Sequence, residues 1–226
     1  MNRGLYFNLI ARPGTLNNLT NFSKFRSKSV HETHELRIHG RGGQGAVLAC
    51  SILAQALIDE GKHAVAIPSF GFERRGAPVA AFLRFDTAPI RAMTNVYHPD
   101  CVVCIDPTVP RTVNIFAGMK PGGTVVLTTK ERLEDLKFPD SVSRVGLCDA
   151  VGIALSIYRK PVTNAVMLGA FARTTELLTL ASLKEALQQM DFRDAGLTEN
   201  LSATERGYNE TEVHELKKVA HAAAVA

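Results

Sequence analysis

The amino-acid sequence predicts an α/β protein built on a mostly parallel, doubly wound β-sheet, followed by a helical C-terminal part. Short apolar runs typical of strands recur between residues 35 and 147. A glycine-rich turn joins the first run to a segment with helical spacing of its apolar residues, and helical spacing dominates again from residue 148 onward. Strands separated by helical crossovers pair in parallel, so the pattern predicts a layered α/β domain.

The strands are predicted from runs that alternate or are apolar throughout. ELRIH alternates and ends at a glycine, whereas CVVCID is continuously apolar, as in a strand buried on both faces. HAVAIP is broken by Pro68, and SVSRVGL is expected to be the last strand. The expected strands are 35–39, 63–68, 79–85, 101–106, 124–129 and 141–147.

The helices are predicted from apolar residues spaced three and four apart. The first follows the glycine-rich turn and closes at Gly61, a residue type that commonly ends helices. Residues 69–78 and 88–99 lack periodicity and are expected to be loops. No internal repeat or linker divides residues 35–226, which we treat as one domain. The expected helices are 44–62, a short one within 111–123, 148–160, 164–178, 182–190 and 203–224.

The composition is that of a globular domain with a sizeable core. Hydrophobic residues make up 46% of the 226 residues, yet no apolar run approaches the roughly 18 residues that a membrane span needs. The four cysteines lie among apolar residues rather than in a spaced framework, which favours a reducing, cytoplasmic compartment.

The positive charge is concentrated at the start of the chain. Residues 1–31 hold five basic side chains and no acidic one, so the remainder carries −1 against +4 for the whole chain. The nearly neutral domain has no nucleic-acid footprint. Residues 1–34 are expected to form a flexible basic leader. It is interpreted as a targeting peptide, as an arm that contacts a partner, or as residues upstream of the true translational start.

A glycine-rich turn is the strongest candidate for a ligand site. Gly40, Gly42 and Gly45 have the spacing of dinucleotide-binding turns, between a strand and a helix whose free amides favour an anion. Gly40 is expected to permit the tight turn, Gly42 the approach of a ligand, and Gly45 close packing of helix on strand. Close packing alone is the alternative. A nicotinamide site should also have an acid after the second strand, where this chain has Ile67-Pro68-Ser69.

Gly43 is also a candidate ligand-binding residue. Four residues with polar side chains join these glycines as candidates. Arg41 would add positive charge to the turn, or be a solvated surface residue; Gln44 offers a donor and an acceptor, or caps the helix. The adjacent Arg74 and Arg75 would grip phosphate or carboxylate, or pair with a neighbouring subunit.

Two candidates lie beyond the turn. Asp106 ends a buried strand at the sheet edge where ligands bind in open α/β folds, or simply starts a turn. Asn164, at the start of a helix, is interpreted as a cap or a contact to a neighbour. Cys101 and Cys104 form a C-x-x-C on a strand, where they point to opposite faces, so buried structural thiols are favoured over a metal site.

The chain resembles a known family in three segments that occur in the same order. These segments are HGRGGQGAVLAC, PSFGFERRGAPVAAFLRF and DCVVCIDPTV. The chain resembles the gamma subunit of the thiamine-diphosphate-dependent 2-oxoacid:ferredoxin oxidoreductases of the pyruvate and ketoisovalerate type, from about Glu35 to about Gly169. Residues 1–34 match nothing in that pattern.

The resemblance implies a Rossmann-like fold and a role in oxidative decarboxylation. Such complexes convert a 2-oxoacid and coenzyme A to acyl-CoA and carbon dioxide, and pass two electrons through iron–sulfur clusters to ferredoxin or another acceptor. Thiamine diphosphate, Mg²⁺ and the clusters are expected on partners: alpha and beta thiamine-binding subunits and a ferredoxin-like delta subunit. The gamma part is associated with coenzyme A. The 2-oxoacid stays open among pyruvate, branched-chain oxoacids and aryl glyoxylates.

The residues themselves also indicate an accessory subunit. The sequence has no GDG-plus-Asn stretch for a magnesium diphosphate and no C-x-x-C-x-x-C for a cluster, and no catalytic residue is assigned. The alternatives are a free-standing Rossmann NAD(P)-binding oxidoreductase and a pure assembly subunit.

Overall fold

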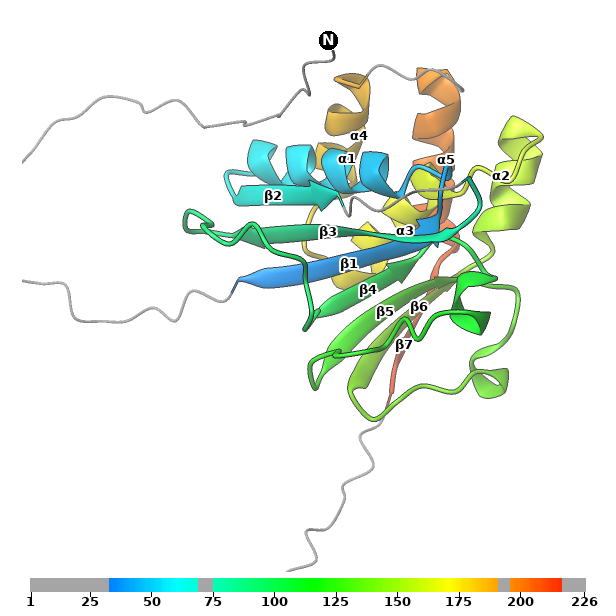
Figure 1. Ribbon diagram of the computed structural model, residues 1–226. Helices are drawn as coiled ribbons and strands as arrows, with labels where there is room; N and C mark the ends of the chain where they lie inside the picture. Colours follow the sequence, from blue (N-terminus) through cyan, green and yellow to red (C-terminus); the bar gives the residue numbers. More distant parts are fainter. Residues whose placement is uncertain (1–32, 69–74, 191–195, 217–226) are drawn as a thin grey trace, which may run out of the picture. The chain divides into compact units, whose positions relative to one another are not determined.

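The computed structural model describes residues 33–68, 75–190 and 196–216, all within one compact unit, His31–Ala226 (Figure 1). The expected leader, Arg74 and the last part of the helix expected over 203–224 lie outside the described residues.

A seven-stranded mixed sheet forms the centre of the domain, in the order β2-β3-β1-β4-β5-β6-β7. Strands β1, β4, β5 and β6 are parallel. Strand β3 pairs antiparallel with both β1 and β2, and β7 pairs antiparallel with β6. The strands are β1 (His34–Arg41), β2 (His63–Pro68), β3 (Pro78–Asp86), β4 (Cys101–Cys104), β5 (Gly123–Thr128), β6 (Val142–Cys148) and β7 (Glu212–Glu215).

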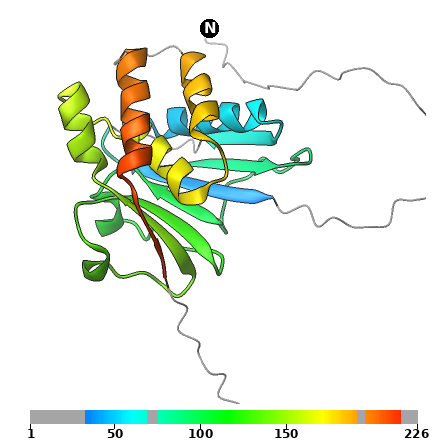
Figure 2. The ribbon, with the colours of Figure 1, turned by 180° about the vertical axis from the view of Figure 1, so that it is seen from behind.

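The α-helices pack together on one face of the sheet (Figures 1 and 2). Their buried apolar residues form one core cluster with Leu36 and Ile38 of β1. A second cluster on the opposite face is covered by the connections around two short 3₁₀ helices, η1 (Val109–Arg111) and η2 (Leu133–Asp135). The α-helices are α1 (Ala46–Asp59), α2 (Ala150–Tyr158), α3 (Asn164–Thr175), α4 (Leu180–Gln188) and α5 (Leu197–Glu210).

The predicted α/β class, with its largely parallel sheet and C-terminal helices, is confirmed. The alternation of faces within strands is confirmed as well: Cys101 belongs to the cluster under the helices and Cys104 to the opposite cluster.

Two element predictions were wrong. The short helix expected within 111–123 is absent from that described segment, where η1 ends at Arg111 and turns follow. The Nη2 of buried Arg37 donates to two backbone carbonyls of this segment, those of Ile115 (2.9 Å) and Ala117 (2.7 Å). These carbonyls are therefore engaged by a side chain rather than by the backbone of a helix. Gly118 adds a left-handed φ of 73°, which a helix does not accommodate.

The second error concerns the C-terminal end of the chain. The helix expected over 203–224 stops early and a further strand follows it, so SVSRVGL is not the last strand. The helix ends at Glu210, Thr211 adopts an extended backbone, and β7 adds a strand to the edge of the sheet. The Thr211 hydroxyl donates to the Gly207 carbonyl and so satisfies a group left open where the helix stops.

The topology places the switch point of the sheet between β1 and β4. From β1 the chain builds β2 and β3 on one side of the sheet, and from β4 it builds β5 and β6 on the other. Ligands of open α/β folds bind where the strand order reverses in this way, outside the carboxyl ends of the strands. None of the described helices is long and apolar enough to span a lipid bilayer.

Candidate ligand-binding site at the glycine-rich turn

The glycine-rich turn carries the chain from the end of β1 into α1. Gly43 and Gly45 have φ angles of 90° and 82°, in the left-handed region where side chains with a Cβ are strained. Gly40 instead lies in β1, where a Cβ would come within 2.8 Å of Ile105 Cγ1. The turn role predicted for Gly40 therefore belongs to Gly43 and Gly45, whereas Gly40 makes room for packing.

Gly42 continues the pairing between β1 and β3. Its N–H donates to the Ala77 carbonyl at 2.9 Å, and its carbonyl accepts from the Gly76 N–H at 3.1 Å. Its backbone amide is consequently engaged within the chain. The donors still open to a ligand are found further along the turn.

Gln44 links the ends of two neighbouring strands. Its Oε1 accepts from the Arg41 N–H at 2.8 Å, and its Nε2 donates to Asp106 Oδ2 at 2.5 Å. No side chain caps α1, so the capping role is not the one observed. Because Arg41 ends β1 and Asp106 follows β4, this side chain joins the carboxyl ends of the two strands.

Arg41 and Asp106 form a neutralised pair beside the turn. Arg41 Nε donates to the Thr108 hydroxyl at 2.8 Å and lies 3.6 Å from Asp106 Oδ1, while its Nη1 donates to the Gly76 carbonyl at 2.9 Å. The guanidinium is thus held within the chain and is not a freely solvated group.

The Asp106 carboxyl is buried, which by itself would raise its pKa. Hydrogen bonds from the Thr108 hydroxyl, from Gln44 and from the Thr108 N–H, together with the Arg41 charge, outweigh burial and hold the pKa below its ordinary value. Asp106 is therefore ionised at neutral pH, and Arg41 offsets the negative charge that would otherwise repel an anion at the turn.

The first turn of α1 presents donors without acceptors. Among the described residues, the amides of Gly45, Ala46 and Val47 have no partner, as expected at an uncapped helix start. These N–H groups and the helix dipole favour a negatively charged group at this point. Gly43 and Val47 are exposed, so a ligand can reach the turn from solvent.

Arg75 supplies a free positive charge at the same place. Its Cγ lies 3.9 Å from the position that a Cβ on Gly43 would occupy, and the residue is exposed. Within the described part of the chain it forms no hydrogen bond and no ion pair. An exposed guanidinium beside unpaired amides is well suited to hold phosphate oxygens.

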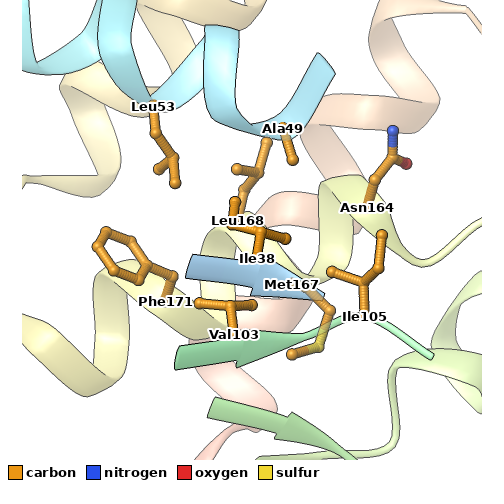
Figure 3. Close-up of a pocket in the computed structure, with 9 residues that line it drawn as sticks. All are labelled: Ile38, Ala49, Leu53, Val103, Ile105, Asn164, Met167, Leu168 and Phe171. Carbon is orange, nitrogen blue, oxygen red and sulfur yellow. The ribbon is translucent and has the colours of Figure 1, made fainter. Parts of the chain in front are cut away.

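The space beneath α1 is closed to a ligand. It is lined by eight apolar residues and Asn164, and it has no room for even a water molecule (Figure 3). A ligand at the turn must therefore lie outside α1, at the edge of the sheet. The apolar lining consists of Ile38, Ala49, Leu53, Val103, Ile105, Met167, Leu168 and Phe171.

The strand order disfavours a nicotinamide dinucleotide at this turn. Such sites take the ribose with an acid at the end of the strand next to β1. Here β3 lies between β1 and β2, so β2 is about 10 Å from β1, or two strand spacings. β2 also ends in Ile67 and Pro68 rather than in an acid.

The cysteines are buried free thiols. Burial raises the pKa of Cys104 to about 12 and that of Cys148 to about 11, and it also raises the pKa values of Cys50 and Cys101. The described ranges contain no group of three His, Cys, Asp or Glu side chains that could hold a metal ion.

The structure brings most of the predicted site residues to one edge of the sheet. The residues from Gly40 to Gly45, Arg75 and Asp106 converge there. Sequence reasoning missed Thr108, which holds both Arg41 and Asp106. A turn-forming Asp two residues before a hydroxyl was the available signal.

An α/β sheet with an anion-favouring turn at its switch point is typical of Rossmann-like proteins that bind phosphorylated ligands. Comparison with known proteins shows the family. The model of the family described as "Pyruvate ferredoxin/flavodoxin oxidoreductase" matches residues 35–210. The chain belongs to this family, and within it is a gamma subunit of a 2-oxoacid:acceptor oxidoreductase complex.

Two similar proteins are named as gamma subunits. The chain is 58% identical over 189 residues to the NADH-dependent phenylglyoxylate dehydrogenase subunit gamma of Aromatoleum evansii, covering 84% of this chain and 100% of that protein. It is 47% identical to the pyruvate/ketoisovalerate oxidoreductases common subunit gamma of Thermococcus kodakarensis, over 80% of this chain and 99% of that one.

Solved structures share the fold. Pyruvate oxidoreductase subunit PORC from Thermotoga maritima superposes with a TM-score of 0.69 at 33% identity, covering 81% of this chain and 99% of that one. A 2-oxoglutarate:ferredoxin oxidoreductase from Magnetococcus marinus, with 2-oxoglutarate, coenzyme A and succinyl-CoA bound, has a TM-score of 0.60 at 19% identity. That match covers 78% of this chain and 30% of the other, and it shows likeness of fold alone.

Proposed function

We propose that the glycine-rich turn of this gamma subunit binds the phosphate groups of coenzyme A, the co-substrate of its oxidoreductase complex. The observation that carries the proposal is the free Arg75 guanidinium beside the unpaired amides at the start of α1. Coenzyme A carries several phosphate charges, and a helix start with an arginine is a favourable place for such a group.

The candidate residues divide into two roles under this proposal. Gly43, Gly45 and Arg75 form the surface that contacts phosphate. The other candidates position this surface. Gly40 accommodates Ile105, and Gly42 pairs with the backbone before β3. The bonds among Arg41, Gln44 and Asp106 fix the ends of β1 and β4.

Packing alone accounts poorly for Gly43. A Cβ at this position would meet nothing within 4 Å except Arg75 Cγ among the described residues, and the glycine is exposed. Its left-handed backbone serves the turn itself, which leads into the uncapped start of α1.

The redox cofactors would be held by companion subunits. We expect alpha and beta subunits with thiamine diphosphate and Mg²⁺, and a ferredoxin-like delta subunit with the iron–sulfur clusters. Two observations support this division, because clusters need grouped thiolates. Cys101 and Cys104 lie on opposite faces of the sheet, and the described ranges contain no group of three His, Cys, Asp or Glu side chains that could hold a metal ion. When bound nearby, thiamine diphosphate supplies the carbanion chemistry of decarboxylation.

An aryl glyoxylate is the 2-oxoacid that we propose for the complex. The support is the 58% identity along the full length of the phenylglyoxylate dehydrogenase gamma subunit, against 42–47% for the pyruvate/ketoisovalerate gamma subunits. The electron acceptor proposed on the same ground is NAD⁺. Assays of the purified complex with phenylglyoxylate and with pyruvate test this choice, and faster turnover of pyruvate at equal concentration would reject it.

Replacing Arg75 tests the coenzyme A site. In the intact complex, Arg75→Ala is expected to raise the KM for coenzyme A about tenfold, the loss of one charged hydrogen-bonding partner, with little change in kcat. Arg91→Ala, which removes an exposed arginine in the 88–99 loop, is the matched control. Equal KM values for both variants and the parent would refute the site.

A further inference from the structure

We propose that Asn164 is a further ligand-binding residue, whose side-chain amide nitrogen donates to the same phosphate group from the start of a second helix. This inference rests on the proposed coenzyme A site and adds to it a residue from the C-terminal part of the chain. Helix α3 begins at Asn164, far from the glycine-rich turn in sequence and next to it in space.

The orientation of the Asn164 amide is set by its own helix. Its Oδ1 accepts from the Ala165 N–H at 2.9 Å, so the oxygen is fixed and the nitrogen must face the other way. That nitrogen lies 2.5 Å from the position of a Cβ on Gly45. Figure 3 shows the amide beside the part of α1 that precedes Ala49, at the edge of the apolar lining.

The nitrogen has no acceptor among the described residues. Asn164 is 91% buried, with 9% of its surface exposed, and among the described residues the only hydrogen bond of its side chain is the one that it accepts from the Ala165 N–H. Among the described residues, the buried side-chain nitrogens without a partner belong to Arg37, His39, Arg144 and His214, so the unpaired Asn164 nitrogen keeps accessible surface and a ligand can reach it. An acceptor from outside the chain would satisfy it, and the amides of Gly45 and Ala46 beside it call for the same kind of acceptor.

Two helix starts meet at this point. α1 has 14 residues and α3 has 12, so both have a developed dipole with its positive end here. The hydroxyl of Thr163 donates to the Ile105 carbonyl at 2.6 Å, which fixes the start of α3 against the end of β4. A phosphate between Gly45, Asn164 and Arg75 would therefore receive donors from α1, from α3 and from the loop before β3.

In this arrangement Gly45 has two roles, one in the backbone conformation of the turn and one in leaving room for Asn164. A Cβ there would displace the Asn164 nitrogen, because the two would lie 2.5 Å apart. The glycine thus gives the backbone its left-handed φ and also leaves the space in which the amide nitrogen can face the ligand.

The test is coenzyme A binding by the intact complex, measured both as KM and by calorimetric titration. Asn164→Asp keeps the shape but replaces the donor with a negative charge, and Asn164→Ala removes the donor alone. We expect the affinity for coenzyme A to fall about tenfold in Asn164→Ala and further in Asn164→Asp, with kcat nearly unchanged. Asn209→Asp, an exposed asparagine on α5, should bind like the parent.

The outcomes separate this inference from the proposed function. Parental affinity in both Asn164 variants, with weakened binding in Arg75→Ala, would overturn the role of Asn164 and leave the coenzyme A site standing. Parental affinity in Arg75→Ala as well would overturn both. If neither Asn164 variant assembles while Asn209→Asp does, the residue is structural and the inference is wrong. Equal losses in Asn164→Ala and Asn164→Asp would likewise assign it to packing.

Discussion

Gln44 Nε2 and Asp106 Oδ2 lie 2.5 Å apart, and this hydrogen bond joins the turn after β1 to the end of β4. The same glutamine accepts from the Arg41 N–H. One side chain therefore holds together the two strand ends between which the sheet reverses its order. The candidate site lies at this junction, because Gln44 directly precedes Gly45, the residue that caps the start of α1.

Removing this junction should destabilise the domain. Gln44→Leu leaves the Arg41 N–H and one lone pair of buried Asp106 without a partner, so we expect the free energy of unfolding to fall by about 2 kcal/mol. Urea denaturation of the full chain measures it. Gln55→Leu removes an exposed bond to Asp59 within the same helix and should cost less than about 0.5 kcal/mol. Equal losses in the two variants would contradict a structural role for Gln44.

Asp106 should make stability depend on pH in the acid range. Its folded pKa is lowered, so its contribution is fully present above its unfolded pKa of about 4 and is lost as the pH falls through the folded pKa. Denaturation measured from pH 6 down to pH 3 should show a steeper loss of stability in the parent than in Asp106→Asn. Parallel curves for the two proteins would show that the carboxylate gains nothing from Thr108, Gln44 and Arg41.

Substitutions at two glycines with nearly equal φ angles should separate the cost of backbone strain from the cost of a steric clash. Gly45 and Gly61 have φ values of 82° and 84°, but only at Gly45 would a Cβ meet a neighbour, Asn164 Nδ2. Gly61→Ala should cost about 1 kcal/mol for the left-handed backbone, and Gly45→Ala about 3 kcal/mol. In a double-mutant cycle, Asn164→Ala should recover part of the larger loss. Additive losses would mean that the two residues do not touch.

The thiols should be inert in the folded protein. All four are buried, and the raised pKa values, about 11 for Cys148 and about 12 for Cys104, leave almost no thiolate at pH 8. Treatment with iodoacetamide should modify none of the four in the native chain and all of them in urea, as counted by intact mass. Rapid native modification of Cys101 or Cys104 would contradict their burial on opposite faces of the sheet.

The sequence predicted those parts of the fold that depend on local patterning. Six of the strands and the long helices follow from the spacing of apolar residues. Strand β7 was missed because four residues, EVHE, follow a long helical pattern, and only pairing with β6 makes them a strand. The prediction of a helix within 111–123 was wrong for a related reason. Arg37, which is distant in sequence, donates hydrogen bonds to two backbone carbonyls of that segment.

The site was predictable in location but not in detail. Glycine spacing after a strand located the turn, yet spacing does not reveal which glycines have a positive φ; these proved to be Gly43 and Gly45. The engagement of Arg41 with Thr108, and the approach of Asn164 to Gly45, are contacts between segments distant in sequence. No local pattern encodes such contacts.

The most direct measurement is a structure of the intact complex with coenzyme A bound. The account predicts phosphate oxygens of coenzyme A within hydrogen-bonding distance of the first α1 amides and of the Arg75 guanidinium. Coenzyme A found with its phosphates held by other chains, and the turn of this subunit buried against a partner without any ligand, would contradict it.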